Sequence, residues 1–124
     1  MKYSFDFSNM PDFVQIKTGE FAVVDDFYKL LKDLTDSPHW VKGAAQIVDH
    51  RHLDLSKMTP ENIKTIRSIV EFYSERLGNG KCGLVVKGDI AHLSAEFYTQ
   101  SARDLHAEIG IFSSIADAEK WIRY

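Results

Sequence analysis

The chain has 124 residues, of which 44% are hydrophobic and 27% are charged, and its formal net charge is −3. This length and composition are typical of a single globular domain over residues 1–124 and argue against a disordered chain. Nucleic-acid binding is not expected either, because the chain has no excess of Lys and Arg to neutralise phosphates.

Cysteine usage and hydropathy indicate the compartment. Cys82 is the single cysteine, so no intramolecular disulfide can form and a reducing compartment fits best. The N-terminus has no apolar segment of signal-peptide length, and no apolar run approaches the roughly 20 residues of a membrane span. We expect a cytoplasmic protein, in which Cys82 is a buried and inert thiol.

The N-terminal third predicts two strands and a helix. Residues 3–7 are typical of an edge strand, and Phe13–Ile16 of a short strand that ends at Thr18-Gly19. A helix is predicted from Val24 to Leu34 and is stopped by Ser37-Pro38. Its apolar stripe consists of Phe27, Leu30, Leu31 and Leu34.

The middle of the chain predicts a central strand at Ala44–Val48 and a helix that starts after Thr59. Thr59 is a good N-cap, and Pro60 suits the first helical position. The turn Gly78-Asn79-Gly80 is expected to end this helix. Its apolar stripe consists of Ile63, Ile66, Val70, Tyr73 and Leu77.

The last third predicts two more strand–helix units. Cys82–Val86 and His106–Phe112 are the strands, and a helix opens at Gly88-Asp89. Ser114, with Asp117 three residues later, resembles a capping box before a last short helix. The helix after Gly88 carries Ile90, Leu93 and Phe97. Alternating strands and helices indicate an α/β protein with a parallel sheet and right-handed crossovers.

The order of features around residues 36–62 resembles a known family. A short helix precedes the pattern Asp-x-Pro-x-Trp-x-x-Gly, an apolar strand that ends in Asp, a polar segment with two Leu, and a capped helix. The residues that carry this order are Asp36, Pro38, Trp40, Gly43, Ile47, Val48, Asp49, Arg51, Leu53 and Leu55. They are similar to the SpoIIAA-like group of STAS-related proteins (sulfate transporter and anti-sigma-factor antagonist). The resemblance implies a four-turn right-handed strand–helix superhelix, with a mostly parallel sheet, an N-terminal edge strand and helices packed on it.

The resemblance also implies a non-enzymatic domain that binds a partner protein. In the true antagonists a Ser or Thr at the start of the helix after the central strand is phosphorylated. The antagonist signature Asp-Ser-Ser/Thr-Gly is absent here, and Met58-Thr59-Pro60-Glu61 occupies that region. Thr59 therefore matches by position only, and this chain looks like a divergent branch whose members bind small apolar ligands or associate with membranes.

The densest polar cluster is Asp49-His50-Arg51-His52. In an extended backbone, His50, His52 and Asp54 share one face and can in principle ligate a metal, but a fourth ligand is not evident. A solvated loop is the favoured interpretation, with Asp49 bonded to backbone amides or to Arg51.

Further polar residues are expected near this cluster. Ser56 and Thr59 lie in the following loop, where Thr59 is foremost a helix cap and an anion or phosphorylation site is the alternative. Asp89 and His92 begin the next helix, and we expect exposed polar residues there, on the same side of the sheet.

Two functions stay open, with a third less favoured. The first is a non-catalytic regulatory or protein-interaction domain that recognises an unidentified protein through Arg51–Ile63 and Gly88–His92. The second is the binding of a small apolar or amphipathic ligand between sheet and helices, with membrane-surface contact and homodimer formation as further options. For that function the candidate cavity-lining residues are Phe27, Leu31, Ile66 and Phe97. The third, an enzyme, requires Asp49, His50, His52 and His92 to converge in one cleft. We expect no catalytic residue, metal or cofactor.

Overall fold

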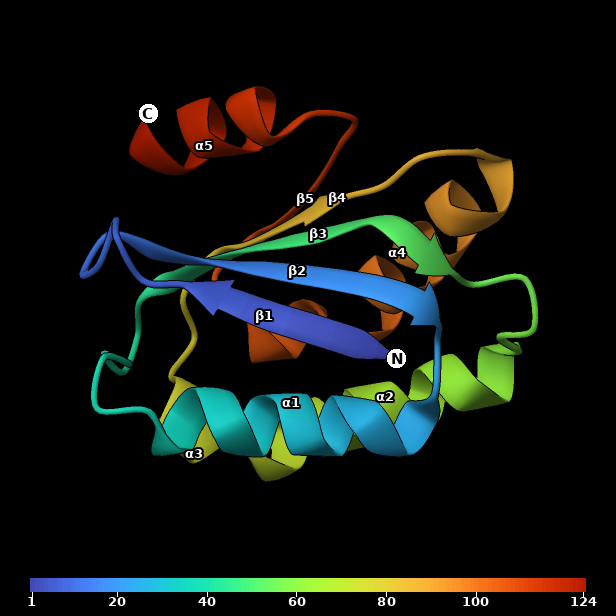
Figure 1. Ribbon diagram of the computed structural model, residues 1–124, viewed down its shortest axis with the longest axis horizontal. Helices are drawn as coiled ribbons and strands as arrows, with labels where there is room; N and C mark the ends of the chain where they lie inside the picture. Colours follow the sequence, from blue (N-terminus) through green and yellow to red (C-terminus); the bar gives the residue numbers. More distant parts are fainter.

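The computed structural model describes residues 1–124 and contains one five-stranded sheet (Figure 1). The strands, in the order in which they pair, are β1 (Lys2–Asp6), β2 (Phe13–Phe21), β3 (Ala45–Asp54), β4 (Cys82–Val85) and β5 (Ile109–Phe112). The helices are α1 (Val24–Asp36), α2 (Pro60–Phe72), α3 (Ser74–Leu77), α4 (Asp89–Ser101), a 3₁₀ turn η1 (Arg103–Leu105) and α5 (Ile115–Arg123).

The sheet is mixed, which corrects the expectation of a mostly parallel sheet. Strands β2, β3, β4 and β5 are parallel to one another, whereas β1 pairs antiparallel with β2. Only residues 7–12 separate β1 from β2, and so short a connection suits an antiparallel pair. The predicted edge position of the first strand is confirmed.

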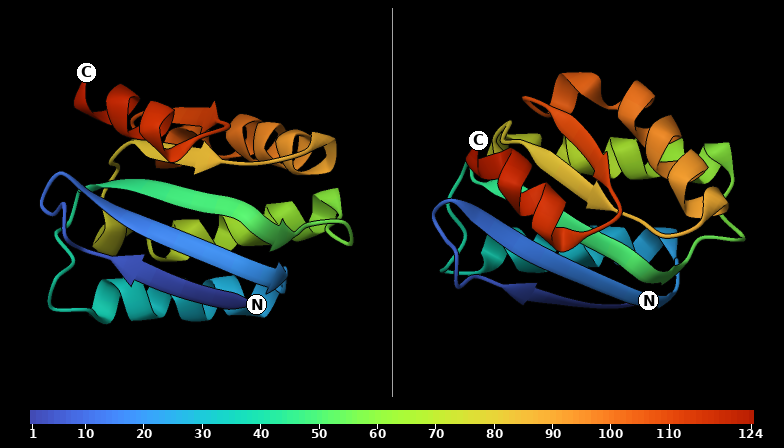
Figure 2. Two further views of the ribbon diagram at one scale, coloured as in Figure 1. Left: turned by 45° about the horizontal axis from the view of Figure 1, so that its top comes forward. Right: turned by 90° about the horizontal axis from the view of Figure 1, so that it is seen from above.

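Helices cover both faces of the sheet. Helices α1, α2 and α4 lie side by side on one face, and α5 alone crosses the other face (Figure 2). The larger core forms beneath the three helices, and the smaller core lies beneath α5 and consists of Phe13, Ala45, Ile47, Val85 and Ala118. We call these the three-helix face and the α5 face.

Strand β3 is longer than the sequence predicts. The apolar run indicated a strand over Ala44–Val48, but β3 continues through the polar residues to Asp54. Its register with β2 shifts within this extension: Lys17 pairs with Asp49 and Gly19 with His52, so His50 and Arg51 together stand opposite Thr18. An extra residue of this kind is a β-bulge, which re-aims the side chains around it.

The Asp36–Gly43 segment has a structural role. Asp36 forms an ion pair with Arg76, the Trp40 indole Nε1–H donates to the Arg76 carbonyl at 3.1 Å, and the Gly43 N–H donates to the Leu77 carbonyl at 2.8 Å. Gly43 has a φ of 88°, which favours glycine. These contacts hold α3 against the turn before β3.

Two element boundaries differ from the prediction. The helix expected to run unbroken from Thr59 to Leu77 divides at Tyr73 into α2 and α3. The last strand starts at Ile109 rather than at His106, because Arg103–Leu105 forms the 3₁₀ turn that precedes it. Half of the capping box predicted at Ser114 and Asp117 is confirmed: the Ser114 Oγ accepts from the Asp117 N–H at 3.2 Å, but the Asp117 side chain does not bond back to the Ser114 N–H.

Candidate functional site

A cavity of about 110 Å³ lies between the sheet and the helices of the three-helix face. It is lined by 21 residues, of which 17 are hydrophobic. The four polar lining residues are Gln46, His50, Ser94 and His106. No Asp, Glu, Lys or Arg side chain lines it, so the wall has no permanent charge.

Small side chains on α4 account for the open space. Ala91, Ser94 and Ala95 face the cavity, while Ile90 and Leu93 point to solvent and are 57% and 64% exposed. The large apolar residues of this helix, Ile90, Leu93 and Phe97, therefore lie on its other side. The inward face has too little volume to fill the gap above the sheet, and interiors are otherwise close-packed.

The predicted lining residues are mostly present. Phe27, Leu31 and Ile66 lie on the wall, whereas Phe97 does not. Its chain neighbour Tyr98 lines the cavity instead, because the helix is turned so that Phe97 lies on the side of Ile90 and Leu93.

His50 lines the cavity where the wall is only half-buried. Its Nδ1 lies 2.6 Å from Thr18 Oγ1, and the Thr18 hydroxyl donates its proton to the Asp49 carbonyl at 3.1 Å. With the Thr18 proton on the Asp49 carbonyl, Nδ1–H of His50 donates to Thr18, and in that tautomer Nε2 is a hydrogen-bond acceptor. Burial lowers the pKa of His50 to about 4 despite the opposing charge of Asp49, so the ring is neutral at pH 7.

Gln46 lies four residues earlier on the same strand and is only 8% exposed. Its side-chain amide forms no hydrogen bond within the protein and keeps accessible surface at the cavity wall. Nearby, the Tyr98 hydroxyl and His106 Nε2 are paired at 2.9 Å, and burial lowers the pKa of His106 and raises that of Tyr98. Burial also raises the pKa of the Cys82 thiol to about 12, which makes it a poor nucleophile.

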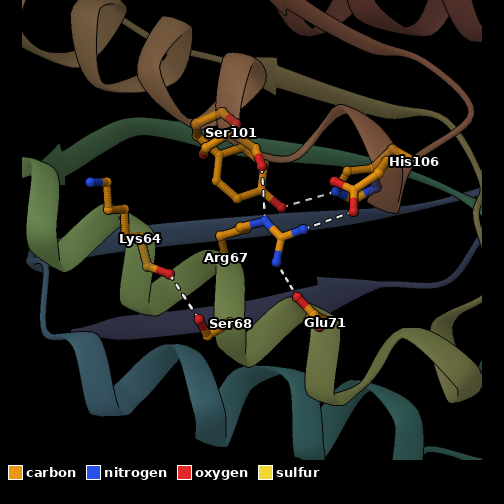
Figure 3. Close-up of polar contacts among 8 residues, drawn as sticks. Lys64, Arg67, Ser68, Glu71, Ser101 and His106 are labelled. Carbon is orange, nitrogen blue, oxygen red and sulfur yellow. Dashed lines mark hydrogen bonds and ion pairs between the residues drawn. The ribbon is translucent and has the colours of Figure 1, made fainter.

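Arg67 ties together the two helices that roof this end of the cavity (Figure 3). From α2 it donates to the Ser101 carbonyl at the end of α4 at 2.8 Å and to Asp104 in η1 at 2.7 Å, and it also pairs with Glu71. The guanidinium therefore fixes α2 against the segment that carries His106.

The opposite side of β3 carries a different polar arrangement. Asp49 is 2% exposed and accepts two hydrogen bonds from the Arg51 guanidinium, at 2.9 and 3.0 Å, and a third from the Arg51 backbone N–H at 3.1 Å. Burial pushes the pKa of Asp49 upward, but the bonds from Arg51 outweigh it and hold the pKa below its usual range. Asp49 is therefore an ionised, fully paired carboxylate.

Arg51 also borders a polar hollow at the carboxyl ends of β3 and β4. The hollow is lined by Arg51, Val86, Lys87, Gly88, Asp89, His92 and Ser113. Three of the predicted site residues, Arg51, Asp89 and His92, thus come together here. His92 Nε2 lies 3.2 Å from Glu96 on the next turn of α4.

The remaining predicted residues do not join either site. His52 is exposed, because the bulge turns it away from His50. The Ser56 backbone N–H donates to Asp54, which closes the turn after β3. No group of three His, Cys, Asp or Glu side chains is placed to hold a metal ion. Asp49, His50, His52 and His92 do not share one cleft.

The arrangement of strands and helices has a counterpart among solved structures. The chain is similar to the crystal structure of an uncharacterized protein from the DUF3478 family of Shewanella loihica PV-4, with a SpoIIAA-like fold. The TM-score is 0.62 and the identity 13%, and the match covers 98% of this chain and 92% of that one. This chain has a SpoIIAA-like fold. No protein-family profile and no curated protein sequence matches it.

Within the SpoIIAA-like fold, the position before α2 is occupied by a conventional helix cap. Thr59 Oγ1 accepts from the Asn62 N–H, and the Asn62 side chain accepts from the Thr59 N–H, both at 3.1 Å. The predicted N-cap is confirmed, with Asn62 completing a capping box. No helix of the fold is both long enough and apolar enough to cross a membrane.

Sequence reasoning missed the polar residues at the inner end of the cavity. Gln46 interrupts an otherwise apolar strand, and it shares the period-two face with Val48 and His50. That alternation is a usable signal for Gln46. Tyr98 and His106 gave no comparable signal, because their meeting depends on the 3₁₀ turn after α4.

Proposed function

We propose that this chain is a non-catalytic binding protein for a small apolar ligand. The observation that carries the proposal is the cavity of about 110 Å³ with an uncharged and mostly hydrophobic wall. An engineered apolar cavity of roughly 150 Å³ in another protein binds benzene, so the scale is sufficient for a small molecule. Ligand sites are typically concave, apolar and supplied with a few polar groups.

The energetic cost of the empty space supports the same proposal. Unfilled apolar space costs folding stability, roughly 24 cal/mol per Å³ where the cavity is enclosed. Larger side chains at Ala91 or Ala95 would recover part of this energy. A ligand that fills the space offers a reason for keeping the small residues.

The proposal is tested by enlarging a side chain of the cavity wall so that it occupies the space. Ala95→Leu adds three carbon atoms to the wall, and we expect it to abolish the binding of 1-hexanol while the protein stays folded. The matched control is Gln100→Leu, which adds a Leu to an exposed position of the same helix. Binding is followed by ¹H–¹⁵N NMR titration. Unchanged hexanol binding by Ala95→Leu, or no binding by the unmodified chain, would contradict the proposal.

A second candidate function is recognition of a partner protein through the polar hollow. The observation that favours it is the convergence of Arg51, Lys87, Asp89 and His92 at the carboxyl ends of the strands, where α/β proteins commonly bind. Arg51 is unsuitable as a probe, because its removal leaves the buried Asp49 carboxylate unpaired. Lys87→Glu reverses an exposed charge instead. Partner capture that is equal for Lys87→Glu and the unmodified chain counts against this role.

A further inference from the structure

Gln46 is the one strongly buried side chain of the cavity wall whose polar group has no partner in the protein. Only 8% of the residue is exposed, and neither its amide N–H groups nor its carbonyl oxygen forms a hydrogen bond within the protein. No fully buried side-chain N or O atom lacks a partner, so the amide keeps accessible surface at the cavity wall, where a bound molecule can reach it. A buried amide that loses its hydrogen bonds to water is costly unless another group replaces them. His106, the other strongly buried polar residue of the wall, is already hydrogen-bonded to Tyr98.

We infer that the cavity takes an uncharged, elongated apolar molecule with one terminal hydroxyl or carbonyl group, which forms a hydrogen bond with the Gln46 amide. This inference rests on the proposed function and specifies the class of ligand. The amide has both donors and an acceptor, so it can serve either group.

The wall excludes a charged ligand group. It has no carboxylate, ammonium or guanidinium, so a carboxylate or amine head group would be desolvated without a counter-charge. The two imidazoles of the wall do not supply one. Burial lowers the pKa of both His50 and His106, which keeps them neutral at pH 7.

The lining residues define a long shape. Gln46, Val48 and His50 alternate along one face of β3, and at about 3.3 Å per residue the distance from Gln46 to His50 is roughly 13 Å. Ile16 and Leu84 pair with Val48 from the strands on either side and also line the cavity. A narrow volume spread over this length suits an alkyl chain better than a compact ring.

The difference in burial between the two ends of the cavity determines how the ligand is oriented in it. At the His50 end, Phe27, Leu55 and Met58 are only half-buried, whereas at the Gln46 end Leu77 and Cys82 are almost fully buried. The ligand therefore enters beside His50, its polar group reaches Gln46, and its apolar tail lies along Val48 toward the opening.

A series of six-carbon probes tests the inference on the full chain. Affinities for 1-hexanol, hexane and sodium hexanoate are measured by ¹H–¹⁵N NMR titration at pH 7. We expect hexanol to bind at least tenfold more tightly than hexanoate. In Gln46→Leu, the affinity for hexanol should fall about fivefold relative to that for hexane, which is the scale of one net hydrogen bond.

The matched control is Gln15→Leu, which makes the same change on β2 outside the cavity and should leave all three affinities unchanged.

NOEs measured on the unmodified chain give a second test. We expect NOEs from the C1 protons of hexanol to the Gln46 side-chain amide. Their absence, or an unchanged ratio of hexanol to hexane in Gln46→Leu, overturns the inference and leaves the proposed function standing. Hexanoate that binds as tightly as hexanol also overturns the inference. If no probe binds at all, the proposed function fails as well.

Discussion

The two faces of strand β3 differ in how closely they are packed and in how their polar side chains are paired. Toward α5 it presents Ala45, Ile47 and Asp49, and toward the three helices it presents Gln46, Val48 and His50. On the α5 face Ile47 is fully buried in a packed cluster, and Asp49 has three hydrogen bonds from Arg51. On the three-helix face the packing leaves a cavity, and Gln46 has no partner.

This difference shows how one strand can combine a close-packed face with a face that borders a cavity. Successive side chains of a strand point to opposite faces, so a residue on one face can differ without changing the packing of the other face. The helix that covers each face sets the outcome. Helix α5 packs Ala118 and Ile115 closely onto its face, whereas α4 turns the small side chains of Ala91, Ser94 and Ala95 toward the sheet and places a large one, Tyr98, only near its C-terminal end.

The largest expected effect comes from truncating matched isoleucines on the two faces. We expect Ile47→Ala to lower the free energy of unfolding by about 4 kcal/mol and Ile66→Ala by about 2 kcal/mol, within the range for such truncations. Ile66 borders the cavity, so part of its surface has no neighbouring atoms to lose. Urea denaturation measures both values. An equal or larger loss for Ile66→Ala would show that the three-helix face is packed as tightly as the α5 face.

A smaller effect separates the faces by pH. The pKa of His50 falls from 6.5 to about 4 on folding, so the unfolded chain binds the proton first and stability is lost as the pH drops below 6.5. Between pH 7 and pH 5 this removes about 2 kcal/mol. The pKa of Asp49 is also lowered, but it is an acid, so its contribution is lost only as the pH falls through its folded pKa, below its usual value of 3.8. The three-helix face therefore weakens first.

His50→Gln tests this order, because Gln keeps a donor for Thr18 and does not titrate. Urea denaturation at pH 7 and pH 5 should show a clearly smaller loss for His50→Gln than for the unmodified chain, with the remaining loss coming from His106. His52→Gln, which changes an exposed histidine on the same strand, should behave like the unmodified chain. If His50→Gln and His52→Gln lose equal stability, His50 is not the titrating group.

The elements of the fold were largely predictable from the sequence, because each has a strong local signal. The Thr59 and Ser114 caps, the Leu30–Leu31–Leu34 stripe of α1 and the apolar strand at β3 are all encoded in adjacent residues. The antiparallel β1 was expected as an edge strand, but its direction depends on pairing with β2, which periodicity does not encode.

The site was less predictable, since it depends on how the elements face one another. Ile90, Leu93 and Phe97 form a regular apolar stripe, yet α4 turns Ala91, Ser94 and Ala95 to the sheet. Both sets of residues recur at the three- and four-residue spacing of a helix, so periodicity alone does not show which set faces the sheet. Packing of α4 against α2 and β5 decides it. The bulge opposite Thr18 likewise separates His50 from His52, although their spacing predicts one face.

The smallest expected effect compares the caps of the helices on the two faces. Thr59→Ala removes one of the two bonds of the α2 capping box, and Ser114→Ala removes the single cap bond of α5, so each should cost about 1 kcal/mol in urea denaturation. Their effects on ligand binding should differ. Loss of the Thr59 cap loosens the turn that carries Leu55 and Met58, which line the open end of the cavity, whereas α5 lies on the other face. Thr59→Ala should therefore weaken 1-hexanol binding while Ser114→Ala leaves it unchanged, and equal affinities in the two variants would mean that the three-helix face does not depend on this turn.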